Sequence, residues 1–216
     1  MQKNIHLIKD CLQILFTQGV RVSMDDIAKE LSMSKRTLYE IFENKNELIY
    51  KCISLLIKEE KERMDYYLSK SDSNIIEELF PFYNIDIYNM MKDRRHIFLD
   101  IKRYYPEIFD KLVASHMENY ILQINESINK GIKQGMFREN INVDIVTAFL
   151  FDLMTSSKQN KELFRKYSME NLFENTVLCY MRGISTEKGQ QLIDDIIKRN
   201  YSGFDNCTMN EMIETK

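Results

Sequence analysis

Glycine and proline are scarce in this chain of 216 residues, which contains 6 Gly and 2 Pro. No glycine occurs between Gly19 and Gly131. Because these two residue types interrupt regular structure more than any others, their scarcity favours long helices. Hydrophobic residues make up 44% and charged residues 29%, a balance typical of folded globular proteins rather than disordered chains.

Long hydrophobic runs are also missing. The most apolar segments, 53–57 and 145–150, are far shorter than the roughly 20 residues that a bilayer-spanning helix needs. At the N-terminus, Asp10 interrupts what would be the apolar region of a signal peptide, and no small-residue cleavage site follows. We therefore expect a cytoplasmic protein with no membrane contact.

Residues that bind metals or carry out catalysis are few and dispersed. The cysteines and histidines are Cys11, Cys52, Cys179, Cys207, His6, His96 and His116. None forms a Cys-x-x-Cys pair or has a neighbour at metal-ligand spacing, so a metal or redox site would need residues that folding brings together. No phosphate loop, nucleophile elbow or His-Glu constellation is present. The sequence predicts neither an enzyme nor a resident metal or cofactor.

The net charge of −3 argues against a protein that coats nucleic acid but allows sequence-specific binding. Residues 1–50 carry seven basic and seven acidic side chains, so this part of the chain is neutral. The placement of the charges is more informative than their sum. Arg21, Lys35, Arg36 and Lys45 lie at or just before expected helix N-termini, where backbone N–H groups and the helix dipole favour phosphate.

Three helix starts follow one another within residues 23–48. Ser23, Ser34 and Asn44 are the N-cap residues, and an acidic residue three positions after Ser23 and Asn44 can complete a capping box. Apolar residues occur between these caps at helical spacing. They are Ile27, Ala28, Leu31, Met33, Leu38, Ile41 and Phe42. This spacing predicts a helix-turn-helix that runs into a third helix.

This stretch resembles the DNA-binding domain of the TetR family of transcriptional repressors. The matching residues are Ser34, Lys35, Thr37, Leu38, Tyr39, Ile41, Phe42, Asn44, Lys45 and Leu48. Two residues depart from the family pattern. Ser32 occupies the turn position where the family usually has Gly, so we expect it in a left-handed backbone conformation, and Arg36 occupies a position where small residues are common.

The resemblance implies a set of DNA-binding residues. They are Ser23, Ser34, Lys35, Arg36, Thr37, Tyr39 and Lys45. By analogy with the family, Ser23, Tyr39 and Lys45 would contact phosphates, whereas Lys35, Arg36 and Thr37 would face base edges in the major groove. Arg36 is the best candidate for reading guanine. The alternative for Arg36 is a solvated side chain that only raises the local charge.

The rest of the chain shows helical periodicity throughout. The expected segments are 3–17, ended by Gly19; 45–69; a segment from Ile75 in which Pro81 causes a kink or marks a delayed start; 97–129, with a break at Pro106; 142–157; 168–181, closed by Gly183; and 185–198. We predict an all-α fold with an N-terminal three-helix DNA-binding domain, followed by a helical ligand-binding and dimerisation domain of about six helices.

The predicted domains are residues 1–48 for DNA binding, 49–200 for ligand binding and dimerisation, and 201–216 as a polar tail. The resemblance implies a homodimer formed mainly by the segments 142–157 and 168–182. Candidate interface residues are Phe149, Leu153, Leu172 and Val177. These side chains could equally belong to an ordinary core. Two-fold pairing is what reading a palindromic operator requires.

The middle of the chain is rich in aromatic residues and Met, which can line an adaptable apolar pocket but also build helical cores. Candidate ligand-binding residues are Phe82, Tyr83, Met90, Phe98, Tyr104, Met117 and Tyr120. If a small, largely apolar ligand binds there, the helix 45–69 is the natural lever for misaligning the recognition helices.

The sequence as a whole predicts a ligand-responsive repressor that binds a palindromic operator on double-stranded DNA as a homodimer. A second hypothesis is an all-helical interaction or adaptor protein that has lost specific DNA binding. Ser32 and the neutral N-terminal domain would favour that alternative, because both could weaken operator recognition.

Overall fold

The computed structural model describes residues 2–68, 73–91, 96–155 and 166–200. These residues form helices and turns, together with one isolated bridge between Phe137 and Ser185. The predicted all-α fold is confirmed. None of the helices in these ranges is long and apolar enough to cross a membrane. The predicted tail, 201–216, lies outside the described residues.

Backbone contacts divide the chain into two compact units. The N-terminal unit comprises Met1–Tyr66 and Lys92–Leu122, and the C-terminal unit comprises Tyr67–Met91 and Gln123–Lys216. Two long helices, α4 (Lys45–Leu68) and α8 (Ala114–Lys133), contribute residues to both units. The domain boundaries at residues 48 and 200 rest on the sequence pattern and stay predictions.

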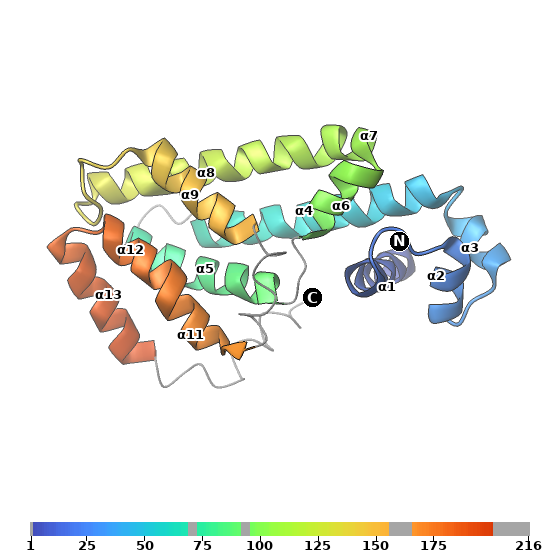
Figure 1. Ribbon diagram of the computed structural model, residues 1–216, viewed down its shortest axis with the longest axis horizontal. Helices are drawn as coiled ribbons and strands as arrows, with labels where there is room; N and C mark the ends of the chain where they lie inside the picture. Colours follow the sequence, from blue (N-terminus) through green and yellow to red (C-terminus); the bar gives the residue numbers. More distant parts are fainter. Residues whose placement is uncertain (1, 69–72, 92–95, 156–165, 201–216) are drawn as a thin grey trace. The chain divides into compact units, whose positions relative to one another are not determined.

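The N-terminal unit contains the first three helices and nearly all of α4, up to Tyr66 (Figure 1). The first three helices are α1 (Gln2–Gln18), α2 (Met24–Glu30) and α3 (Lys35–Ile41). The unit also contains α6 (His96–Tyr104), α7 (Pro106–Ile108) and the π-helical turn η1 (Phe109–Val113). Gly19 ends α1 with a φ of 82°, and Pro106 starts α7 after a break, so both predicted interruptions are confirmed.

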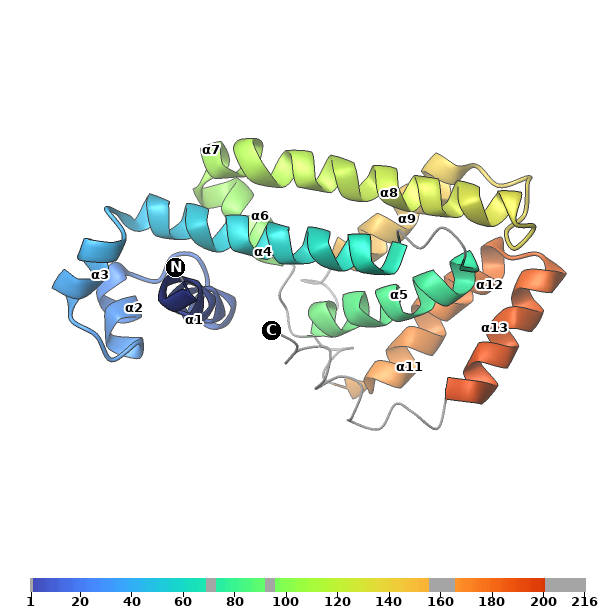
Figure 2. The same cartoon turned by 180° about the vertical axis from the view of Figure 1, so that it is seen from behind.

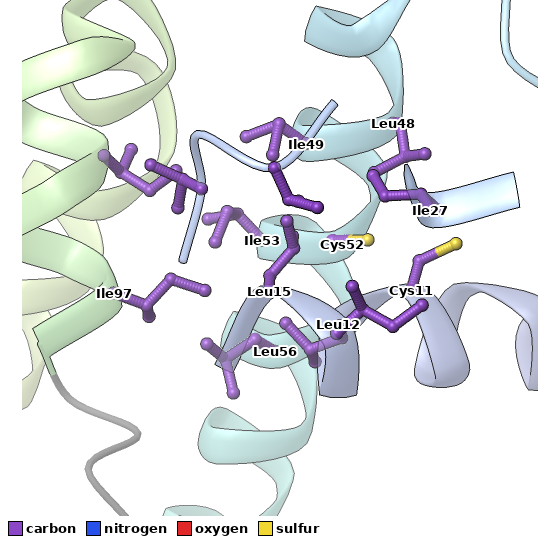
Figure 3. Packing of buried hydrophobic residues seen from close by; sticks show 14 of the residues in the cluster. Cys11, Leu12, Leu15, Ile27, Leu48, Ile49, Cys52, Ile53, Leu56 and Ile97 are labelled. Atoms are coloured by element: carbon purple, nitrogen blue, oxygen red, sulfur yellow. The ribbon is translucent and has the colours of Figure 1, made fainter. Parts of the chain in front are cut away.

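The core of the N-terminal unit lies between α1 and α4 (Figure 3). Leu15 of α1 and Ile53 of α4 are fully buried there, with Ile27 of α2 and Ile97 of α6 beside them. Cys11 and Cys52, which lie 41 positions apart in the sequence, both belong to this core. A hydrogen bond with Cys11 and burial raise the pKa of Cys52, which keeps its thiol protonated.

The C-terminal unit packs its helices around α5 (Figure 2). Its elements are α5 (Ile75–Met91), the end of α8, α9 (Val143–Thr155), α11 (Met169–Phe173), the π-helical turn η2 (Glu174–Leu178), α12 (Cys179–Ile184) and α13 (Glu187–Asn200). The rings of Phe80 on α5 and Phe173 on α11 meet edge to face, with centroids 4.9 Å apart. Lys130 on α8 forms a 2.7 Å ion pair with the buried Glu78 of α5.

Three details in this unit differ from the sequence prediction. Helix α5 begins at Ile75, six residues before Pro81, so a start delayed to the proline is wrong. Gly183 lies inside α12 rather than closing it, because Ser185 is the residue that leaves the helical conformation. The segment capped by Ser168 is not uniformly α-helical, since η2 interrupts it.

Candidate nucleic-acid interface

The N-terminus of α2 is capped as predicted. The Ser23 hydroxyl oxygen accepts a hydrogen bond from the backbone N–H of Asp26 at 3.1 Å. The same hydroxyl donates to the Asp26 carboxylate at 2.5 Å. Asp26 therefore bonds the side chain of the cap and not its backbone N–H, so the capping box is only half formed.

The next two caps also follow the prediction. Ser34 accepts from the backbone N–H of Thr37 at 3.0 Å at the start of α3, and Asn44 accepts from that of Glu47 at 2.9 Å at the start of α4. The Glu47 carboxylate reaches back to the N–H of Glu43, one residue before the cap. Each short helix of the motif thus begins at a fixed residue.

The turn between α2 and α3 contains the expected backbone conformation. Ser32 has a φ of 52°, the left-handed region that an L-residue adopts at a cost. The next residue, Met33, donates its N–H to the carbonyl of Ala28 at 2.9 Å, which closes the turn. Ala28 is buried, and its small side chain suits the close contact between α2 and α3.

Buried residues fix which face of α3 points outward. Leu38 in α3 and Phe42 at its end are fully buried against the core. Ile41 is partly buried against the same core, and the other side chains of α3 point toward solvent. The exposed residues are Lys35, Arg36, Thr37, Tyr39 and Glu40.

The outward side chains of α3 have local partners. Lys35 Nζ lies 2.7 Å from Asp25 Oδ1 of α2, and hydrogen bonding to that carboxylate raises the pKa of Lys35. Arg36 Nε lies 3.1 Å from Glu40 Oε1. Ion pairs this exposed are weak, so both cations remain available to another anionic partner.

The residues expected at phosphates lie at the same unit. Ser23 is exposed, and Tyr39 is 43% exposed, with Lys35 Nζ 6.0 Å from its ring centroid. Lys45 opens α4, where burial and then the charge of Arg21 lower its pKa. The structure therefore brings the predicted DNA-binding residues together on α2, α3 and the start of α4.

The predicted ligand-binding residues are divided between the two units. Phe82 and Tyr83 are buried side by side in the C-terminal unit, with ring centroids 5.5 Å apart. Phe98, Met117 and Tyr120 belong to the N-terminal unit, where Phe98 and Tyr120 are buried and Met117 partly so. Tyr104 is exposed at the end of α6, and the side chain of Met90 lies outside those described.

The predicted interface residues also occupy different environments. Leu172 and Val177 are buried within the C-terminal unit, which accounts for their apolar character inside one chain. Phe149 on α9 is 67% exposed. The side chain of Leu153 lies outside the described residues.

Sequence reasoning missed the two carboxylates at the recognition helix. Glu40 follows Arg36 by four positions, a spacing that could have revealed this ion pair. Asp25 precedes Lys35 by ten positions, and only the fold of the turn brings them together. In the part of the chain that the structure describes, no cluster of three metal-ligating side chains occurs.

Comparisons with known proteins agree with this geometry. Residues 8–51 match the family model described as bacterial regulatory proteins, tetR family. No curated protein sequence matches the chain. The matching family and solved structures are transcriptional regulators and not enzymes.

Many solved structures share the fold across most of the chain. The ketosteroid transcriptional regulator KstR2 of Mycobacterium tuberculosis is 18% identical, with a TM-score of 0.67 over 86% of this chain and 96% of that one. The fatty acid degradation regulator FadR of Bacillus halodurans is 18% identical, with a TM-score of 0.63 over 81% of this chain and 92% of FadR. A TetR-family regulator of Agrobacterium tumefaciens is 15% identical, with a TM-score of 0.69 over 84% of this chain and 98% of that regulator.

The left-handed residue in the turn gives a stability prediction. Ser32→Gly should raise the free energy of unfolding by about 0.5–1 kcal/mol, because glycine adopts a positive φ without the steric cost that serine bears. Ser32→Ala is the matched control and should leave stability nearly unchanged. Urea unfolding followed by circular dichroism measures both. A Gly variant no more stable than the Ala variant would show that the turn carries no strain.

Proposed function

We propose that this chain, whose residues 8–51 match the family model described as bacterial regulatory proteins, tetR family, is a ligand-responsive repressor of that family that binds a palindromic operator as a homodimer. The observation that carries the proposal is the capped and exposed recognition helix α3 beside α2. Repression and ligand binding are typical of the family.

In the proposed complex, α3 enters the major groove with its N-terminal residues toward the base edges. Lys35, Arg36 and Thr37 contact bases there, and the planar guanidinium of Arg36 suits the two acceptors of guanine. Ser23, Tyr39 and Lys45 hold phosphates and so set the position of the helix. On binding, Lys35 and Arg36 exchange Asp25 and Glu40 for DNA.

A homodimer would supply the second recognition helix that a palindrome needs. Helix α9 offers a surface for this pairing, because Ile145 and Phe149 are 66% and 67% exposed at a spacing of four residues. Large apolar side chains that are exposed together on one helix face favour an interface. We therefore propose that Phe149 and Ile145 take part in dimerisation.

Selection of bound sequences from a random duplex pool tests the DNA-binding proposal. We expect the wild-type protein to enrich a two-fold-symmetric site, and the Lys35→Ala/Arg36→Ala variant to lose that enrichment because it lacks the two cations nearest the base edges. Lys58→Ala is a matched control, since Lys58 is an exposed lysine of α4 that pairs with Glu62. It should enrich the same site as the wild type.

Other selection results would argue against the proposal. Enrichment of the same site by the wild type and the double variant would show that α3 does not read the bases. No enrichment by the wild type, with or without added ligand, would favour the adaptor hypothesis.

The C-terminal unit supplies support for a ligand. The Thr147 Oγ1 and Tyr180 Oη atoms are buried, and neither has a hydrogen-bond partner among the described residues. A buried hydroxyl without a partner is costly, and a polar group of a largely apolar ligand would satisfy it. Two similar structures are named as ketosteroid and fatty acid degradation regulators, so we propose a ligand of fatty acid or steroid type.

Tyr180→Phe tests this ligand proposal. The unliganded variant should be more stable by about 1 kcal/mol, because it no longer buries an unsatisfied hydroxyl. Palmitic acid and progesterone are the probes, and the one that binds should raise the unfolding temperature of the wild type more than that of the variant. Calorimetry measures both effects. A destabilised variant, or equal stabilisation of both proteins by the bound probe, would contradict the role given to Tyr180.

A further inference from the structure

The cations of α3 differ from three cations beside the helix-turn-helix in whether a carboxylate pairs with them. Those of the recognition helix are locally neutralised, because Lys35 pairs with Asp25 and Arg36 with Glu40. Arg21, Lys45 and Arg103 form no ion pair with a carboxylate in the described part of the chain. The positive charge available without breaking a contact therefore lies beside the helix-turn-helix and not on α3.

Two of these cations share an aromatic ring at the end of α6. The guanidinium carbon of Arg21 lies 5.5 Å from the ring centroid of Tyr104, and that of Arg103 lies 5.3 Å from the same centroid. Both arginines are exposed, and Tyr104 is 38% exposed. Stacking on an aromatic ring restrains the long arginine side chains while leaving their N–H groups free to donate.

Neighbouring contacts attach this cluster to the helix-turn-helix. Arg21 precedes Ser23, the cap of α2, by two residues, and its charge is close enough to contribute to the lowered pKa of Lys45. Tyr105, the residue that follows α6, donates a hydrogen bond from its hydroxyl to the carbonyl of Val20 at 3.4 Å. The end of α6 is thus fixed to the loop that leads into α2, within the same unit.

We propose that Arg21 and Arg103, stacked on Tyr104, form a second phosphate-binding surface that contacts the DNA backbone outside the bases read by α3. This inference rests on the DNA-binding function proposed above. We call these three residues the arginine platform. Two guanidinium groups that each lie within 5.5 Å of one exposed aromatic ring and have no carboxylate partner suit the oxygens of a phosphate backbone.

The arginine platform accounts for DNA binding by a neutral domain. Each phosphate contact releases counterions, so affinity depends on local positive charge and not on the net charge of the domain. The platform also makes α6 part of the DNA contact. A movement of α6 would then weaken DNA binding directly, in addition to any effect on α3.

The salt dependence of operator affinity tests the platform. Arg21→Ala/Arg103→Ala removes two cations from each protomer, hence four from a dimer. The logarithm of the operator association constant falls linearly with the logarithm of the salt concentration. For this variant the slope should be less steep by about 3.6, because each of the four phosphate contacts contributes about 0.9. At ~0.1 M salt the loss of affinity should be on the order of a hundredfold or more. Fluorescence anisotropy on the selected operator, with and without flanking base pairs, gives both quantities.

Three further variants make the result specific. Arg21→Lys/Arg103→Lys keeps the charges and should retain most of the slope, whereas Lys58→Ala should leave it unchanged. Lys35→Ala removes a cation of α3 and should weaken operator binding if α3 lies in the major groove. Circular dichroism verifies that each variant is folded. The double alanine variant should lose more affinity for the duplex that carries flanking base pairs than for the duplex without them.

The outcomes separate the platform from the function on which it rests. If the wild type binds and Lys35→Ala weakens binding while the double alanine variant keeps its slope, the platform is wrong and the proposed function stands. An equal change in slope for Lys58→Ala would also overturn it, because the effect would then come from total charge. If the wild type binds no duplex under any condition, both proposals fail.

Discussion

Packing of α1 against α4 is the interaction on which the DNA-binding surface depends. Helices α2 and α3 have seven residues each and are too short to persist in water alone. They are held because Ile27 and Leu38 are buried in the core that Leu15 and Ile53 form across α1 and α4. Caps and the closed turn then set the orientation of α3. Damage to the core would therefore remove DNA binding without touching a DNA-contacting residue.

The sequence predicted those features that neighbouring residues decide. The caps of α2 to α4, the break at Pro106 and the left-handed Ser32 all follow from local chemistry. Helical periodicity also predicted many of the buried residues, although Phe149 is exposed, and it could not identify the element against which they pack. For this reason Leu172 and Val177 were candidates for a dimer interface, although they lie in the core of one unit. Contacts distant in sequence, such as that between Arg21 and Tyr104, were not predictable.

The placement of individual charged side chains says more about the electrostatics of this protein than its net charge does. A chain with a net charge of −3 presents unpaired arginines beside a recognition helix whose own cations are paired. In the proposed complex, the paired cations of α3 give up a carboxylate when they contact DNA, which favours sites where base edges replace that partner well. The unpaired cations give up nothing of this kind. The proposed division is thus between specificity from α3 and salt-dependent affinity from the arginine platform.

In the proposed complex, two copies of the chain place two α3 helices on one face of the operator. Hydroxyl-radical footprinting on the selected operator can detect both helices at once. We expect two protected half-sites, related by a dyad and separated by about one helical turn of DNA or a multiple of it. A single protected half-site at saturating protein would contradict the dimeric account, and uniform protection along the duplex would contradict specific recognition.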